Sequence, residues 1–177
     1  MNKLAKYYQY RENIKPGDLI SCRGKGIIPG IISWKTGFKD THSTMAMCWL
    51  GKGREKRLVI TEALNFGPTV NYLSDRILKY DGEVWWYSLF ATQEQREKVN
   101  QIAWDNLCKQ TRYDYGGLFR QALGSVSLDA SRLFCSEMVQ YCWQEAGIIK
   151  EYKKAFNPGQ LIQEFIGSKL TTGVKLN

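Results

Sequence analysis

Histidine is the scarcest chemically useful residue in this sequence, because His42 stands alone among 177 residues. Zinc hydrolases that hold their metal with two or three imidazoles are therefore excluded. The cysteines are odd in number, and no two form a C-x-x-C pair, which argues against a zinc clamp, a dithiol redox centre and a disulfide scaffold. They are Cys22, Cys48, Cys108, Cys135 and Cys142. We expect a reducing compartment, no bound metal and no cofactor.

Long apolar runs are also missing. No window approaches the ~18 uninterrupted apolar residues of a membrane span, and the first residues lack the apolar core of a signal peptide. We therefore expect a soluble protein that is cytoplasmic as synthesised. The chain has no internal repeat, low-complexity tract or linker, so a single domain over residues 1–177 is predicted.

The charge is strongly one-sided. Lysine and arginine number 25 against 17 aspartates and glutamates, giving a formal net charge of +8. Such an excess favours polyanionic partners, here an anionic wall polymer or a membrane surface. The basic residues are scattered, and no RNA-recognition, zinc-finger or helix-turn-helix signature is present, so nucleic acid is not the expected partner.

The order of the elements indicates the fold class. Residues 18–22, 43–50, 57–64, 69–73 and 83–89 carry strand patterns, and the second and third of these are joined by a long turn. Residues 27–34 predict a short helical or irregular segment. Helices are predicted over 92–109, behind a capping box at Thr92, over 136–146, and from Asn157–Pro158 onward. Strands followed by helices argue an α+β fold, with an antiparallel sheet packed against helices.

Cys135 is the candidate nucleophile. It directly precedes the helix predicted to begin at Ser136, and the unpaired N–H groups of a helix N-terminus favour a thiolate over a thiol. The same groups would stabilise a developing oxyanion, which makes Ser136 a candidate substrate contact. Cys142 and the other cysteines fall at apolar or strand positions and are interpreted as core residues.

A thiolate needs an imidazole to carry protons and a third polar group to orient that imidazole. His42 is the only imidazole in the chain and stands at the entrance of the 43–50 strand. The neighbouring strand offers Glu62 or Asn65 as the third group, depending on register. A carboxylate in an otherwise apolar strand is unusual, which favours Glu62. Trp34 and Tyr115 are candidates for lining an apolar or sugar-stacking groove, although strand aromatics more often belong to a core.

The sequence around Cys135 resembles that of a known superfamily. Tyr113-Asp114-Tyr115-Gly116-Gly117, followed by Leu133-Phe134-Cys135-Ser136, is similar to the nucleophile region of the NlpC-type cysteine peptidases. In that superfamily the histidine follows the cysteine, whereas His42 precedes it. The chain therefore resembles the circularly permuted branch, the YiiX-like and lecithin retinol acyltransferase-like papain folds. Pro16-Gly17-Asp18-Leu19-Ile20 and Val59-Ile60-Thr61-Glu62-Ala63 support this order of motifs.

The resemblance implies a permuted papain-like fold with Cys135 as nucleophile, His42 as base and then acid, and Glu62 as the residue that orients His42. It also implies that the hydroxyl of Tyr113 helps hold the thiolate or the oxyanion. Phe134 and Glu137 depart from the usual aspartate and glycine, as in permuted members, and Thr44 replaces a smaller residue.

Such a pair attacks acyl carbons and forms an acyl-enzyme. We therefore predict a thiol hydrolase that cleaves an amide, with a cell-wall peptide as the first expected substrate. A lipid ester or amide hydrolase, an acyltransferase, and a non-catalytic module binding lipid or wall fragments remain as alternatives, because the residues alone do not choose among acceptors.

Overall fold

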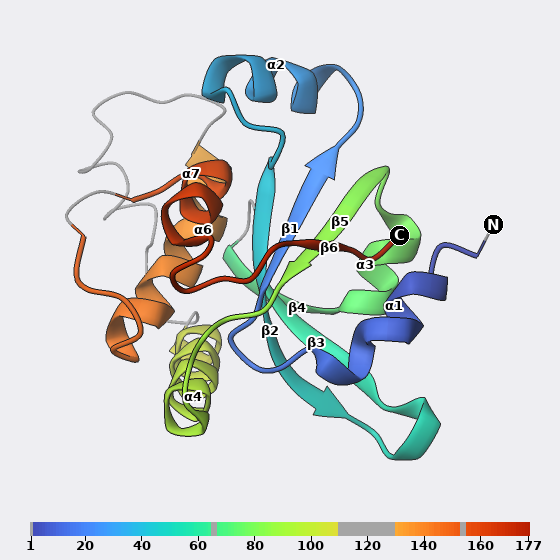
Figure 1. Ribbon diagram of the computed structural model, residues 1–177, viewed down its shortest axis with the longest axis vertical. Coiled ribbons are helices and arrows are strands. Elements are labelled where there is room, and N and C mark those ends of the chain that lie inside the picture. The colour runs from blue at the N-terminus through green and yellow to red at the C-terminus, as the bar shows by residue number, and fades with distance from the viewer. Residues whose placement is uncertain (1, 65–66, 110–129, 153–154) are drawn as a thin grey trace.

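The strand-forming segments of the first half of the chain pair into one sheet, as the computed structural model shows (Figure 1). The structure describes residues 2–64, 67–109, 130–152 and 155–177. The helices are α1 (Ala5–Tyr10), α2 (Ile27–Thr36), α3 (Leu73–Lys79), α4 (Gln93–Lys109), α6 (Ala130–Glu145) and α7 (Pro158–Phe165). The strands are β1 (Leu19–Gly24), β2 (His42–Leu50), β3 (Arg57–Leu64), β4 (Gly67–Tyr72), β5 (Gly82–Tyr87) and β6 (Val174–Lys175). Within the described ranges, two short 3-10 turns cover Arg11–Asn13 and Gly53–Glu55.

The sheet is antiparallel, with the strand order β4-β3-β2-β1-β5-β6. The predicted α+β class is confirmed. In the register, Cys22 lies opposite His42 and Met45 lies opposite Thr61. These pairings put the first residue of β2 and the distal part of β3 at the same end of the sheet.

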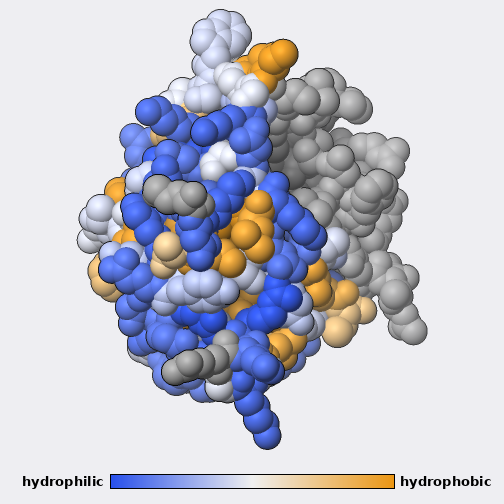
Figure 2. All heavy atoms as spheres, turned by 90° about the vertical axis from the view of Figure 1, so that its right-hand side faces the viewer, coloured by the Kyte–Doolittle hydropathy of each residue, from blue (hydrophilic) through white to orange (hydrophobic). Residues whose placement is uncertain are grey.

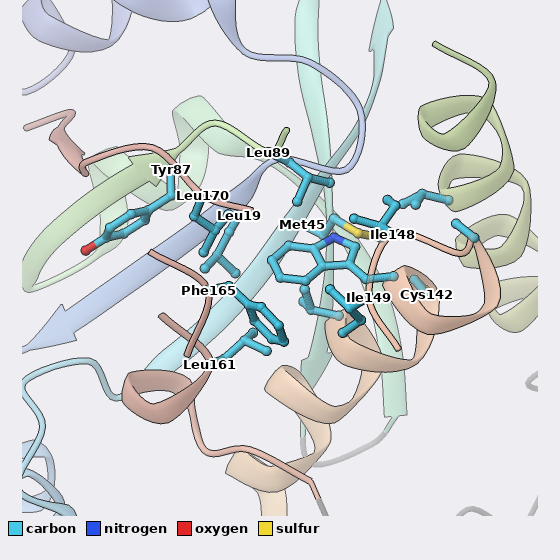
Figure 3. Packing of buried hydrophobic residues seen from close by; sticks show 14 of the residues in the cluster. Leu19, Met45, Tyr87, Leu89, Cys142, Ile148, Ile149, Leu161, Phe165 and Leu170 are labelled. Carbon is cyan, nitrogen blue, oxygen red and sulfur yellow. The ribbon is translucent and has the colours of Figure 1, made fainter. Parts of the chain in front are cut away.

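Side chains alternate between the two faces of the sheet, and both faces are covered. Leu19, Met45 and Val59 point into a core shared with α4, α6 and α7. Figure 3 shows this packing, with Phe165 and Leu161 directed toward Leu19 and Met45. The intervening residues of the strands point into a second core with α1 and α3. Figure 1 shows the two groups of helices on opposite sides of the sheet.

The predicted helix starts carry the expected caps. The N–H of Gln95 donates to Thr92 Oγ1 at 3.2 Å, and Gln95 Oε1 accepts the N–H of Thr92 at 3.0 Å. Asn157 and Gln160 form the same reciprocal box before α7, with Pro158 at its first turn. These contacts satisfy backbone donors that a helix N-terminus otherwise leaves unpaired.

Three elements lie outside the sequence prediction. Helix α1 and helix α3 were not expected, and α3 begins at Leu73, where a strand was predicted to end. Strand β6 adds two residues to β5 far from the other strands in sequence. In the described part of the chain, no helix is both long enough and apolar enough to traverse a lipid bilayer.

A buried ion pair fixes α4 to the sheet. Asp18, with no exposed surface, precedes β1 and accepts from Arg96 Nη1 at 2.8 Å and from the N–H of Leu89 at 3.0 Å. Its other oxygen accepts from Trp86 Nε1 at 2.8 Å. Arg96 also donates to the carbonyl of Pro16 at 2.7 Å. One carboxylate therefore connects the start of β1, the end of β5 and α4.

Replacing Arg96 by alanine is expected to destabilise the protein by about 3–5 kcal/mol, because it leaves the buried Asp18 carboxylate uncompensated. Urea denaturation followed by circular dichroism measures this loss. Lys98→Ala, an exposed cation on the same helix, is the matched control and should change stability little. Equal effects of the two substitutions would contradict the role given to the Asp18–Arg96 pair.

Candidate active site

Cys135 lies in the body of α6, and not at a helix start as the sequence analysis predicted. The helix already runs from Ala130, because residues 130–134 contain no proline or glycine to stop it. Cys135 thus sits in the second turn, beyond the first turn in which the macrodipole acts most strongly. Helix N-terminal activation and a helix-start oxyanion hole are therefore wrong, and the thiol must be activated by neighbours.

One of these neighbours is the backbone of β2. The N–H of Ser43 donates to Cys135 Sγ at 3.4 Å, and the sulfur is completely buried. Strand β2 pairs with β3 from Met45 opposite Thr61 to Leu50 opposite Arg57. Ser43 therefore lies two residues before the first of these pairs. Helix α6 thus brings its sulfur against β2 beside the end of this ladder, where the thiol meets a strand N–H.

The imidazole of His42 lies between the sulfur and a carboxylate. His42 is hydrogen-bonded to Cys135. On its other side, His42 Nε2 lies 3.5 Å from Glu62 Oε1. That separation is at the outer limit of a hydrogen bond, so we treat the contact with Glu62 as an ion pair. The side chain of His42 keeps 16% of its surface exposed, whereas that of Glu62 has none.

Glu62 is itself held by two further residues. Asn71 Nδ2 donates to its Oε2 at 2.6 Å, and Arg76 Nε donates to its Oε1 at 2.6 Å. Arg76 Nη2 forms an ion pair with the same oxygen. Asn71 comes from β4, the neighbour of β3, and Arg76 from α3, which covers this face of the sheet. A buried carboxylate is stable only with such partners, and here they also fix the oxygen that faces His42.

These contacts shift the ionisation of all three groups. Burial by itself lowers the pKa of His42, but the charge of Cys135 and the interactions with Cys135 and Glu62 outweigh it and raise the pKa to about 9. Burial raises the pKa of Cys135, but His42 and the N–H groups of Ser43 and Ser136 outweigh that effect and lower it. Burial likewise opposes ionisation of Glu62, yet His42, Arg76 and Asn71 bring its pKa to about 2. The shifts of His42 and Cys135 both act in the direction of a thiolate–imidazolium pair, which the Glu62 carboxylate backs.

The other cysteines have a different environment. All five thiols are free. Burial raises the pKa of Cys22 and of Cys142 to about 12, and it also raises the pKa of Cys48. Cys142 packs in the core between α6 and the sheet. A buried thiol without a cationic neighbour is inert. Cys142 is therefore not activated, although it lies close to Cys135 in the sequence.

The structure brings together Cys135, His42 and Glu62, whereas the side chain of Ser136, another predicted site residue, makes a different contact. Ser136 is buried, and its Oγ donates to the carbonyl of Phe156 at 2.6 Å, a contact between α6 and the segment before α7. Trp34 lies on α2 with 86% of its surface exposed. Tyr113, Tyr115 and the alternative third residue Asn65 lie outside the described residues.

Asn71 and Arg76 are the site residues that sequence reasoning missed. The signal that could have found them is Glu62 itself, since a carboxylate in an apolar strand requires a cation and a donor nearby. Arg76 follows the 69–73 run closely enough to fold back over β3, but only if a helix starts at Leu73. Because helix α3 was not predicted, the contact between Arg76 and Glu62 could not be predicted either.

The coupling between His42 and Cys135 can be measured from both sides. The C135A substitution should lower the pKa of His42 from about 9, because it removes the negative charge that contributes most to raising it. The reciprocal H42A substitution should raise the pKa of Cys135. NMR titration of the single imidazole reports the first change, and thiolate absorbance at 240 nm the second. Substitution of the exposed Cys108 by alanine is the control, and an unchanged imidazole titration in C135A would contradict the ion pair.

Arg76→Gln should destabilise the protein on the order of 3 kcal/mol, because it removes the main cation facing a buried carboxylate. Glu62→Gln removes the charge that Arg76 compensates, so the double substitution should cost clearly less than the sum of the two single ones. Urea unfolding of the four proteins gives the coupling energy. Arg57→Gln, which loses an ion pair with the partly exposed Asp75 on the same helix, is the matched control. Strict additivity of R76Q and E62Q would overturn the assignment.

The comparisons with known proteins bear on the fold. No family model matches the chain, and no curated protein matches it. Among solved structures, the crystal structure of the metalloprotein YiiX from Escherichia coli O157:H7 is similar, with a TM-score of 0.52 and 24% sequence identity. The match covers 77% of this chain and 68% of that chain. The described elements therefore form an α+β fold related to that of YiiX.

Proposed function

We propose that this protein is a thiol hydrolase that cleaves an amide bond through an acyl-enzyme, using Cys135, His42 and Glu62. The observation that carries the proposal is the hydrogen-bond contact between the buried Cys135 and the partly exposed imidazole of His42, with pKa shifts in the direction of a thiolate beside an imidazolium. Shifted ionisation of this kind is typical of nucleophile sites, because a thiolate is the reactive form of cysteine.

The first half-reaction follows from these charges. The Cys135 thiolate attacks the carbonyl carbon of the amide, and the carbonyl oxygen takes up the negative charge. The His42 imidazolium then gives its proton to the amide nitrogen as the C–N bond breaks, so that the amine leaves neutral and a thioester to Cys135 remains. Glu62 faces His42 Nε2 throughout and stabilises the positive ring before the proton is transferred.

The second half-reaction uses the same residues in reverse. The imidazole, now neutral, takes a proton from a water molecule, whose oxygen attacks the thioester carbon. The C–S bond breaks and the sulfur leaves as the thiolate, so the pair returns to its starting charges with the carboxylic acid released. The anchored position of Glu62 between Arg76 and Asn71 keeps the ring oriented for both steps.

We further propose that the fold is the circularly permuted form of the NlpC-type papain-like fold, in a single domain over residues 1–177. In support, His42 and Glu62 come from neighbouring strands that precede the cysteine-bearing helix, which is the order of the permuted branch. The likeness to YiiX is in keeping with this proposal. The role of Tyr113 in holding the thiolate or oxyanion remains a prediction from the family resemblance.

A cell-wall peptide is the first proposed substrate. A lipid ester or amide is the second, and it gains support from an exposed apolar helix near the site, described below. Transfer of the acyl group to an acceptor other than water would use the same thioester. A non-catalytic binding module is the remaining alternative, and it would need neither the thiolate nor His42.

A metal does not fit the site residues. YiiX is described as a metalloprotein, but in this chain both oxygens of Glu62 are engaged by Arg76 and Asn71. The guanidinium group of Arg76 would repel a divalent cation bound at that carboxylate. Within the described ranges, no three histidine, cysteine or acidic side chains are arranged to hold an ion. We derive no step through a metal.

The test is turnover and trapping of the acyl-enzyme on two substrate panels, cell-wall peptides and lipid esters or amides. Wild-type protein should release amine or fatty acid, and mass spectrometry after rapid acid quench should find the acyl group on the peptide containing Cys135. C135A should lose ~10⁴-fold or more in kcat/KM, and H42A about 10²–10⁴-fold.

C108A is the control for both variants, since Cys108 is an exposed thiol on another helix. Circular dichroism establishes that C135A remains folded. Full activity in C135A, or acylation at another residue, would refute the proposed nucleophile. Binding of a substrate without turnover, unaffected by H42A, would instead identify the non-catalytic module.

A further inference from the structure

Helix α2 presents an unusual apolar surface to solvent. Ile27, Ile31 and Trp34 are 82%, 57% and 86% exposed, among the large hydrophobic residues left outside the two cores. Their spacing of four and three residues places them on one face of the helix. Gly30 lies on the same face and adds no side chain. We call Ile27, Ile31 and Trp34 the α2 stripe.

The opposite side of α2 is fixed to the body of the protein. Gly24 of β1 lies so close to α2 that a Cβ atom there would come within 2.7 Å of Pro29 Cγ. The helix ends at Gly37, whose φ of +74° favours glycine and turns the chain toward β2. Because the side of α2 that carries Pro29 packs against β1, the α2 stripe on the opposite side faces solvent. Figure 2 shows hydrophobic and near-neutral side chains gathered at the top of the molecule, where α2 lies in Figure 1.

The segment around α2 is basic. Residues 19–39 contain no acidic residue. Their four basic residues are Arg23, Lys25, Lys35 and Lys39. Lys25 and Lys39, which flank the helix, are exposed. Asp40, the next acidic residue in sequence, is buried and neutralised by Arg23, and Asp81 borders Lys25 from the loop before β5. An apolar stripe with a tryptophan, flanked by lysines, is the pattern of a helix that lies in the headgroup region of an anionic membrane.

We propose that α2 docks this protein on an anionic lipid bilayer, with the α2 stripe inserted at the acyl boundary and Lys25 and Lys39 against the headgroups. A tryptophan suits that depth, since its ring is apolar and its N–H remains near water. The docking would bring the active site to the membrane, because only residues 37–41 separate α2 from His42. In the segment 37–41, Phe38 packs against Gly159 at the start of α7. A Cβ atom added at Gly159 would lie 2.2 Å from the Cβ of Phe38.

The proposal does not depend on turnover at Cys135 and is tested with the full chain and C135A alike. Flotation with phosphatidylcholine vesicles is compared with flotation of vesicles that contain about one-third phosphatidylglycerol. Wild-type protein and C135A should float with the anionic vesicles and much less with the neutral ones. The I31S/W34A double substitution should weaken binding about tenfold or more, since it removes most of the inserted apolar surface. K25E/K39E should weaken it to a similar extent.

Two matched variants control for general effects. F90A removes a half-exposed aromatic ring on another segment, and K98E reverses an exposed charge on α4, so neither should change flotation. Absence of binding to anionic vesicles would overturn the proposal. So would binding that responds to K25E/K39E but not to I31S/W34A, which would indicate surface adsorption without insertion. A dimer in light scattering that I31S/W34A converts to monomer, without vesicle binding, would identify a second copy of the chain as the occupant instead.

Discussion

Glu62 carries its charge in the interior of the protein, where an ionised carboxylate is costly unless its neighbours compensate it. The compensation comes from three elements at once: Asn71 on β4, Arg76 on α3 and His42 on β2. Each of these contacts also fixes a direction. The position of the imidazole, and through it the ionisation of Cys135, therefore depends on β3 and β4 being paired and α3 being packed on them.

A similar device occurs on the opposite side of the sheet. Asp18 is as completely buried as Glu62, and Arg96 of α4 pairs with it as Arg76 of α3 pairs with Glu62. In both cases an arginine from a helix reaches a carboxylate in or beside a strand. Two helices on opposite faces are thus positioned by directional charge contacts in addition to apolar packing, which specifies their placement more sharply than side-chain burial does.

The parts of the fold that sequence predicted are those with a local cause. The strands over β1, β2 and β3 and the starts of α4 and α7 follow from side-chain alternation and from caps such as Thr92 and Asn157, which act within a few residues. Helix α3 is short and is stabilised through Leu73 and Ile77, which pack in the second core. Strand β6 exists because Val174 pairs with Trp86. Contacts between distant segments decided both, and no local pattern encodes them.

The candidate site divides in the same way. Residue type and strand position singled out Cys135, His42 and Glu62, because few side chains in the chain offer that chemistry. The means of activation was wrong, since the helix starts at Ala130, six residues before the predicted start at Ser136, and helix boundaries are poorly marked when no breaker is present. Arg76 and Asn71 depended on the placement of α3 and β4, which the sequence left open.

The assembly of the site from distant segments also has a consequence during synthesis. His42, Glu62, Arg76 and Cys135 are separated widely along the chain, and they meet only when the sheet and α6 have come together. Before that stage Cys135 is an ordinary, mostly protonated thiol of low nucleophilicity. A nascent or partly unfolded chain therefore carries no activated thiolate that could react with other molecules. The cysteine becomes reactive only when the native structure is complete.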